Sequence, residues 1–329
     1  GRLPLLVNLL LNYYITYRLL RQHKNIPHCF MMFINKAINT ILFYFAVHDI
    51  ISAVYQLFYT KNTEVNILLT INTYLRAKSL DEAYKTLQNR GNIILGGMLW
   101  LKMQNKTVNT AIDLCDLGLD KIEVNGEKIR IGSMSTLRQL ETSVLLYEIT
   151  YGAVSECLKH IVGVQFRNLA TVGGSVYGRF GFSDIITLLL ALDAEVELYA
   201  GKTMPLSEFI ETPAERDIIV SVSIPNRKRP VVYLSQRNSY SDFPVLTCAL
   251  STADGNFVCS VGARPMKAVA IKDNNILSGG ITDKSAEEFA AYVSENMEFG
   301  SNQRASAGYR RRVCETLVKR AVLAISKEC

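Results

Sequence analysis

This sequence has few histidines, no closely spaced cysteine pairs and no large excess of either charge. Only one of the four histidines, His160, lies beyond residue 48, so no Ser–His–Asp or Cys–His catalytic set can be assembled without it. His160 lies in an apolar segment, where a packing role is the commoner one. The net charge is only +6, and no basic stripe is interleaved with aromatic residues, which argues against a nucleic-acid-binding protein.

The seven cysteines form no C-x-x-C pair, and their number is odd. This spacing argues against a zinc or iron–sulfur site within the chain, so we predict no metal ligands. A disulfide framework is equally untypical of a chain of 329 residues. We therefore expect free, buried thiols in a reducing cytoplasm.

Standard nucleotide-binding motifs are also missing. There is no G-x-G-x-x-G, so a Rossmann site is not supported. Gly201-Lys202-Thr203 is similar to the end of a P-loop, but Val196 stands where the motif needs glycine and Pro205 follows where a helix should begin. We predict a hairpin turn there.

Residues 1–68 differ in composition from the rest, with six basic groups, two acidic groups and one glycine. They contain two apolar stretches, Leu3–Leu20 and Ile38–Tyr59. The second is long enough to span a bilayer at about 20 residues, but it contains His48 and Asp49. Three interpretations stay open: a membrane anchor, a helical extension, or an atypical segment outside the functional fold. We favour the third.

From residue 69 onward the pattern is orderly. Ser79–Glu82 is a capping-box sequence that predicts the start of a helix. Asn92–Leu95 is a short apolar run, typical of a buried strand, that leads into Gly96-Gly97, and Ala111–Leu114 is a second run of this kind. Residues 69–120 therefore read as a small α/β unit.

Residues 121–228 mix strands and helices without strict alternation, which predicts an α+β unit. Asn125-Gly126 lies between two alternating runs and predicts a hairpin. Further elements are expected as a helix from Thr136, a helix over Asp184–Leu192 capped by Ser183, and strands over Glu195–Tyr199 and Asp217–Ile224.

The segment Pro225–Pro230 reads as a linker to a third, smaller α+β unit over residues 229–329. A capping box at Ser285–Glu288 predicts one helix, and Arg310–Arg312 is expected on a solvated helix face. Strands are expected near Val231–Leu234, Val245–Ser251 and Asn256–Gly262, and a final helix around Tyr309–Ile325.

Two glycine pairs, Gly96-Gly97 and Gly173-Gly174, each follow a predicted strand. Glycine lets the backbone approach a ligand closely, and successive amides in such a turn bind anions. Either pair alone would usually be a tight turn, as we expect for Gly279-Gly280. Taken together and in this order, the two pairs predict a site for the two phosphates of a dinucleotide.

Several segments together resemble the FAD-binding medium subunit of molybdenum hydroxylases, the xanthine dehydrogenase and carbon monoxide dehydrogenase flavoprotein family. They are Asn92–Gly97 with Lys102-Met103, Arg167–Gly174, Ser183–Ala194, and Arg304–Ser306 with Tyr309–Arg311. The resemblance runs from about Thr70 to near the end. It implies an α+β fold with a p-cresol methylhydroxylase-type FAD domain of two subdomains, followed by a small α+β C-terminal domain.

The resemblance also implies the cofactor contacts. Asp184 would hold the adenosine ribose, and Ile161 and Ile219 would line the flavin or the adenine. The remaining FAD contacts would be Ile93, Ile94, Leu95, Gly96, Gly97, Met98, Leu99, Ala170, Thr171, Val172, Gly173, Gly174 and Ser175.

As an oxidoreductase of this kind, the chain would pass electrons from iron–sulfur clusters through FAD to NAD or another acceptor. Its partners would be a molybdopterin-binding large subunit and an iron–sulfur small subunit with two two-iron clusters. The sequence departs from the family where Met98 and Leu99 replace polar residues, where Ser175 replaces asparagine, and where no lysine lies between Val231 and Ser251. Two alternatives therefore stay open: a scaffold subunit that has lost FAD, or a membrane-tethered protein.

Overall fold

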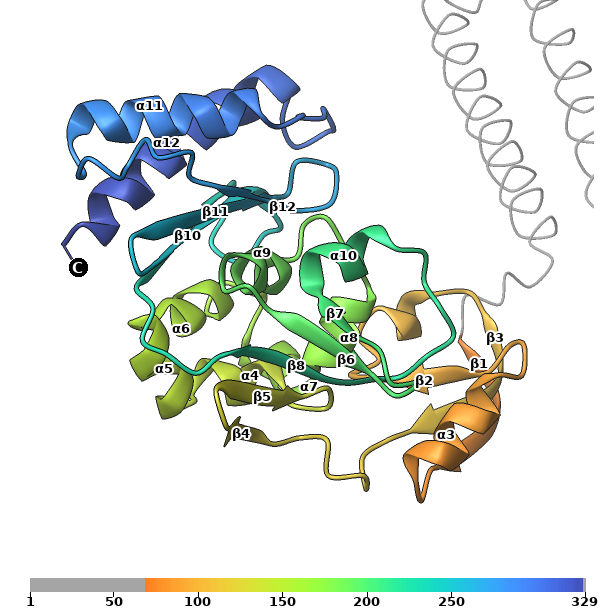
Figure 1. The fold of residues 1–329 in the computed structure, drawn as a ribbon. Helices are drawn as coiled ribbons and strands as arrows, with labels where there is room; N and C mark the ends of the chain where they lie inside the picture. The colour runs from red at the N-terminus through yellow and green to blue at the C-terminus, as the bar shows by residue number, and fades with distance from the viewer. Residues whose placement is uncertain (1–68, 328–329) are drawn as a thin grey trace, which may run out of the picture. The chain divides into compact units, whose positions relative to one another are not determined.

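The computed structural model describes residues 69–327, which form three β-sheets with helices packed between and over them (Figure 1). The anchor, extension and atypical-segment interpretations of residues 1–68 lie outside the described residues. Between residues 69 and 327, no helix is both long and apolar enough to cross a membrane.

The first sheet is parallel and holds the first glycine pair. Its order is β1-β3-β2, and helix α3 (Leu80–Leu87) packs beside it. Ser79 caps α3 as predicted, but Glu82 accepts the amide of Lys78 rather than that of Ser79, so the capping box is incomplete. The strands are β1 (Thr70–Arg76), β2 (Ile93–Leu95) and β3 (Thr107–Asp113), with the short 3-10 helix η1 (Leu101–Met103) after β2.

The second sheet is antiparallel, in the order β4-β5-β8-β6-β7. The predicted hairpin joins β4 to β5, but Asn125 still pairs with Lys128 and only Gly126 in the turn has a positive φ, of 59°. The turn is therefore centred one residue later than predicted. The strands are β4 (Ile122–Asn125), β5 (Lys128–Gly132), β6 (Glu195–Leu198), β7 (Thr203–Pro205) and β8 (Ile219–Pro225).

A series of short helices accompanies this sheet. Thr136 forms the predicted capping box with Gln139, and Ser183 caps the predicted apolar helix. The helices are α4 (Leu137–Glu141), α5 (Val144–Thr150), α6 (Ala153–Leu158), α7 (Val164–Leu169), α8 (Val172–Tyr177), α9 (Asp184–Ala191) and α10 (Leu206–Glu211).

The prediction that a strand precedes Gly173-Gly174 was wrong. The residues before this pair form α7, and the pair itself lies in the first turn of α8. Thr171 makes one isolated bridge to Thr136 and then caps α8 by accepting the amide of Gly174. The apolar run was misread because a short helix and a short strand carry the same hydrophobic signal.

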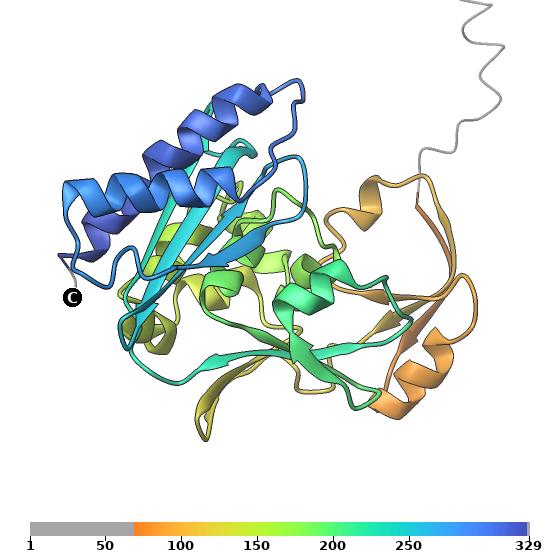
Figure 2. The same ribbon diagram turned by 45° about the horizontal axis from the view of Figure 1, so that its top comes forward.

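The third sheet is antiparallel, in the order β12-β11-β10-β9. Two long helices, α11 and α12, cover one face, and α9 lies against the other (Figure 2). The elements are β9 (Val231–Arg237), β10 (Pro244–Ala253), β11 (Asn256–Gly262), β12 (Val269–Lys272), α11 (Asp283–Glu295) and α12 (Ala307–Ile325).

Two expectations for this region were wrong, the start of α11 and the exposure of Arg310, whereas Arg311 and Arg312 are exposed as predicted. The helix α11 begins before Ser285, because Thr282 caps it and forms the capping box with Ser285. Arg310 is not on a solvated face: it is 1% exposed and donates hydrogen bonds to the carbonyls of Val245 and Ala305 and to the side chain of Asn302. One of these acceptors, the carbonyl of Val245, is 65 residues away, and a local pattern does not reveal such a partner.

The largest hydrophobic core joins the second and third sheets. Ile131 and Leu189 belong to the same buried cluster as Tyr233 and Ala249. The predicted α+β class is confirmed. The boundaries at 120/121 and 228/229 stay a prediction, because a shared core does not show which parts would fold alone.

Candidate functional site

The two glycine pairs, more than 70 residues apart in the sequence, meet in the structure. A methyl group on Gly96 would lie 3.5 Å from Cα of Gly174 and 2.9 Å from Oγ1 of Thr171. A methyl group on Gly97 would lie only 1.9 Å from the carbonyl oxygen of Leu169. Contact this close is possible only without side chains, so the loop after β2 and the start of α8 form one backbone junction.

The backbone amides of the two pairs are used differently. Gly173 donates to the carbonyl of Ser133 at 2.7 Å, and Gly174 donates to Thr171 Oγ1 at 3.2 Å. The amides of residues 96–99 make no hydrogen bond to any residue that the structure describes. The free donors for an anion therefore come from the first loop, while the second pair provides close approach.

The first cleft has a volume of about 310 Å³ and lies beside this junction. Its walls come from the ends of β2, β5 and β8 and from the start of α8. Arg216 fixes the adjoining loop by donating to the carbonyls of Asn89 at 2.7 Å and Asn92 at 3.1 Å. The predicted site residues that line it are Ile93, Ile94, Leu95, Gly96, Thr171, Gly173, Gly174 and Ile219.

The second cleft, of about 160 Å³, is walled by aromatic rings. Neighbouring ring centroids are 5.6 Å apart for Trp100 and Phe180, 5.1 Å for Phe180 and Phe182, and 4.7 Å for Phe182 and Phe243. The predicted site residues that line it are Ile161, Ser175 and Asp184. Because Gly173 and Gly174 line the first cleft and Ser175 lines the second, the start of α8 separates the two.

Five predicted site residues line neither of these clefts. Val172 and Ala170 are buried in the main core, and Leu99 packs against it. Met98 has a positive φ of 57° and packs with Leu101 against the core of the first sheet. These residues and Gly97 form the frame of the junction rather than its walls.

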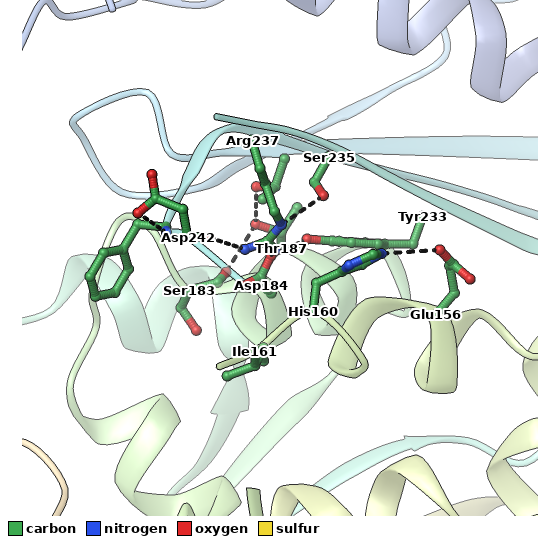
Figure 3. A network of polar contacts seen from close by, with 12 residues as sticks. Glu156, His160, Ile161, Ser183, Asp184, Thr187, Tyr233, Ser235, Arg237 and Asp242 are labelled. Atoms are coloured by element: carbon green, nitrogen blue, oxygen red, sulfur yellow. Dashed lines mark hydrogen bonds and ion pairs between the residues drawn. The ribbon is translucent and has the colours of Figure 1, made fainter. Parts of the chain in front are cut away.

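Asp184 begins α9 and is the centre of a buried polar network (Figure 3). Its carboxylate accepts hydrogen bonds from the guanidinium of Arg237 and the hydroxyl of Tyr233, and the side chains of Asp184 and Arg237 are each 7% exposed. Burial raises the pKa of Asp184 above its ordinary value, against the opposing effects of Arg237 and Tyr233. Burial and the Asp184 carboxylate raise the pKa of Tyr233, which therefore stays a neutral donor.

Two residues of the predicted site lie apart. Asp184, expected at the adenosine ribose, lines the second cleft, and Ile219, expected beside the flavin or the adenine, lines the first. The sequence analysis also missed Arg237 and Tyr233, which lie 53 and 49 residues from Asp184 and carry no local motif.

His160 lies at the edge of the second cleft (Figure 3). Its Nε2 is 3.5 Å from Oε1 of Glu156, and its ring centroid is 4.6 Å from that of Tyr240. It packs as expected, but its buried Nδ1 makes no hydrogen bond to any described residue.

Residues 66–227 match a family described as the FAD binding domain in molybdopterin dehydrogenase. Residues 66–227 therefore form a domain of this family. The chain's curated relatives include the glyceraldehyde dehydrogenase medium chain of Sulfolobus acidocaldarius, 24% identical over 76% of this chain and 96% of the relative. They also include the nicotine 6-hydroxylase medium subunit of Paenarthrobacter nicotinovorans, 26% identical over 76% of this chain and 95% of the relative.

Two solved structures share the fold. Quinoline 2-oxidoreductase from Pseudomonas putida 86 gives a TM-score of 0.69 at 18% identity, covering 78% of this chain and 97% of that chain. Reconstituted CO dehydrogenase from Oligotropha carboxidovorans gives a TM-score of 0.69 at 20% identity, covering 78% of this chain and 98% of that chain. The resemblance drawn from the several sequence segments is thus confirmed, and so is the oxidoreductase class that the relatives share.

Proposed function

We propose that this chain is the FAD-binding electron-transfer subunit of a xanthine dehydrogenase-like molybdenum hydroxylase. The observation that carries the proposal is the junction of the two glycine pairs between two clefts. Unpaired amides at residues 96–99 and close approach at Gly174 suit a diphosphate, and the clefts on either side suit the two ends of a dinucleotide. The described residues therefore fit FAD.

The aromatic cleft is the better place for the flavin ring, because planar rings stack favourably on a planar ligand. The charged groups that would tune the flavin also lie there, with Asp184 fixed by Arg237 and with Asp242 paired to Arg304 at 2.5 Å. The adenosine then occupies the first cleft, against Ile219. This assignment replaces the expectation that Asp184 holds the adenosine ribose.

When bound, FAD supplies the electron-transfer chemistry, and the protein binds and orients it. Asp184, held by two donors, keeps a fixed carboxylate beside the aromatic rings. Trp100, Phe180 and Phe243 are each 37% exposed, so the rings that enclose this cleft also reach the surface. Such a position lets electrons enter from one partner and leave to another.

We infer the partners from the relatives, whose names describe medium chains and subunits. The complex would contain a molybdopterin-binding large subunit and an iron–sulfur small subunit, and electrons would leave to NAD or another acceptor. A cytoplasmic location is supported by the five described cysteines, all of which are free thiols.

The test is to purify the chain, measure its flavin absorbance, and add NADH without oxygen. We expect a yellow protein whose flavin absorbance falls when NADH is added. A yellow protein that NADH does not bleach would retain FAD binding but contradict NAD as the acceptor.

A second candidate, a scaffold subunit that has lost FAD, is favoured by one contact. The hydroxyl of Ser175 donates to the carbonyl of Thr171 at 2.8 Å, so it is used within α8. Met98 and Leu99 add no polar group to the junction. A colourless protein that leaves the absorbance and fluorescence of added FAD unchanged would support the scaffold and contradict the flavoprotein.

A further inference from the structure

Ser133 is the first residue after β5, and its backbone is held from two sides. Its amide donates to the carbonyl of Val220 in β8 at 3.0 Å, and its carbonyl accepts the amide of Gly173 in α8 at 2.7 Å. A methyl group on Gly173 would lie 2.7 Å from Cβ of Ser133. The second glycine pair is therefore pressed directly against this serine.

The side chain of Ser133, by contrast, makes no hydrogen bond within the described part of the protein. The residue is 3% exposed, and its Oγ is a buried atom that makes no hydrogen bond to any residue between 69 and 327. A buried hydroxyl has lost its hydrogen bonds to water, so it destabilises the fold unless another partner replaces them. Two other hydroxyls nearby are satisfied: Ser135 donates to the carbonyl of Lys121 at 3.4 Å, and Thr171 accepts the amide of Gly174.

Ser133 lines the first cleft together with Gly173 and Gly174. The residue that carries the unpaired hydroxyl therefore lines the cleft, beside the junction where the diphosphate is placed. We propose that Ser133 Oγ donates a hydrogen bond to an oxygen of bound FAD in this cleft, on the diphosphate or the adjoining ribose. The inference rests on the proposed function and assigns this chain a polar cofactor contact at a residue that no motif identifies.

This contact would also compensate for the polar side-chain contacts that the junction lacks. Met98 and Leu99 offer no side-chain donor after the first pair, and the hydroxyl of Ser175 is used by Thr171. Ser133, just after β5, packs against Gly173 of the same junction. FAD binding would then depend on free backbone amides from one loop and a serine hydroxyl from another.

The experiment compares Ser133→Ala with Ser135→Ala in the full chain. For each variant, FAD affinity is measured by titrating the apoprotein with FAD, and the stability of the apoprotein is measured by urea unfolding. Ser133→Ala should weaken FAD binding by roughly five- to tenfold, the loss expected for one hydrogen bond to a ligand. It should leave the apoprotein as stable as the wild type or more stable, because it removes an unsatisfied buried hydroxyl.

Ser135→Ala serves as the control, because it removes a neighbouring buried hydroxyl that already has a partner. It should lower the stability of the apoprotein and leave the affinity for FAD unchanged. The inference is overturned if Ser133→Ala binds FAD as tightly as the wild type, or if its loss of affinity accompanies a matching loss of apoprotein stability. A wild type that does not bind FAD would overturn the proposed function itself, and the inference with it.

Discussion

At the scale of the residue, the four glycines of the junction are not equivalent. Gly97 has no room for a side chain, since a methyl group would lie 1.9 Å from a backbone oxygen. Gly174 has more room: its nearest neighbours would be Thr171 Oγ1 at 3.1 Å and Gly96 Cα at 4.0 Å. Gly97 is therefore required by packing, whereas Gly174 has the space that the proposed ligand would approach.

This difference predicts opposite outcomes for two alanine variants. Gly174→Ala should keep most of its stability and lose FAD affinity by about tenfold or more, because the methyl group enters the space between the pairs. Gly97→Ala should lower the unfolding free energy by about 2 kcal/mol or more through a backbone clash. Urea unfolding and FAD titration of both variants check this. Equal stability for the two would contradict the distinction.

The buried pair of Asp184 and Arg237 gives a second residue-scale prediction. Asp184→Asn leaves the guanidinium without a charged partner and should cost about 3 kcal/mol of unfolding free energy. Asp254→Asn is the matched control, because Asp254 pairs with Arg227 at 2.6 Å on the surface and should change stability by less than about 0.5 kcal/mol. Chemical unfolding would measure the loss of unfolding free energy in both variants. Similar losses would show that burial of the Asp184–Arg237 pair is not the cause of its stabilising effect.

At the scale of the element, α7 is tied to α4 by a buried ion pair. Arg167 donates to both carboxylate oxygens of Glu141, at 2.8 and 2.9 Å, and to the carbonyl of Ile161 at 2.9 Å. The two side chains are 5% and 10% exposed. Since α7 ends at the carbonyl of Leu169 that meets Gly97, this pair sets the position of the junction.

The pair makes stability depend on pH in a definite direction. Burial would raise the pKa of Glu141, but the hydrogen bonds and charges of Arg167 and Arg138 outweigh it and hold the pKa below the ordinary value of 4.5. The stabilisation is therefore present above that value and is lost as the pH falls through the lower pKa of the folded state. Glu141→Gln should cost about 3 kcal/mol near neutral pH and progressively less in acid.

Urea unfolding of the wild type and of Glu141→Gln at several pH values would measure this dependence. Glu215→Gln is a suitable control, because Glu215 forms an exposed pair with Lys202. If the difference between wild type and Glu141→Gln stayed constant down to acid pH, the ionised pair would not be the source of the stabilisation.

At the scale of the whole molecule, residues 69–327 contain the three sheets, the glycine junction and both clefts. The family match covers residues 66–227 and leaves out nearly all of residues 1–68. We predict that removing residues 1–68 leaves the flavin content per protein unchanged. Absorbance spectra of the shortened and full-length proteins would check this, and a colourless shortened protein would show that the first segment belongs to the functional fold.

The amino-acid sequence by itself determined the family, the α+β class and most of the elements. Hydrophobic periodicity and capping residues are local, so the helices capped by Thr136 and Ser183 could be predicted from a few neighbouring residues. The two glycine pairs could be recognised for the same reason. Where the local signal was ambiguous, as before Gly173, the prediction was wrong.

Only the tertiary structure decided which residues meet. The contact of Gly96 with Gly174, the pairing of Asp184 with Arg237 and Tyr233, and the hydrogen bond from Gly173 to Ser133 all join segments that are distant in the sequence. Burial and hydrogen-bond satisfaction depend on what the rest of the chain places around an atom. The sequence therefore predicted a cofactor site, and the fold showed that the amides of the first glycine pair make no hydrogen bond to a described residue, while Gly173 of the second pair packs against a buried serine.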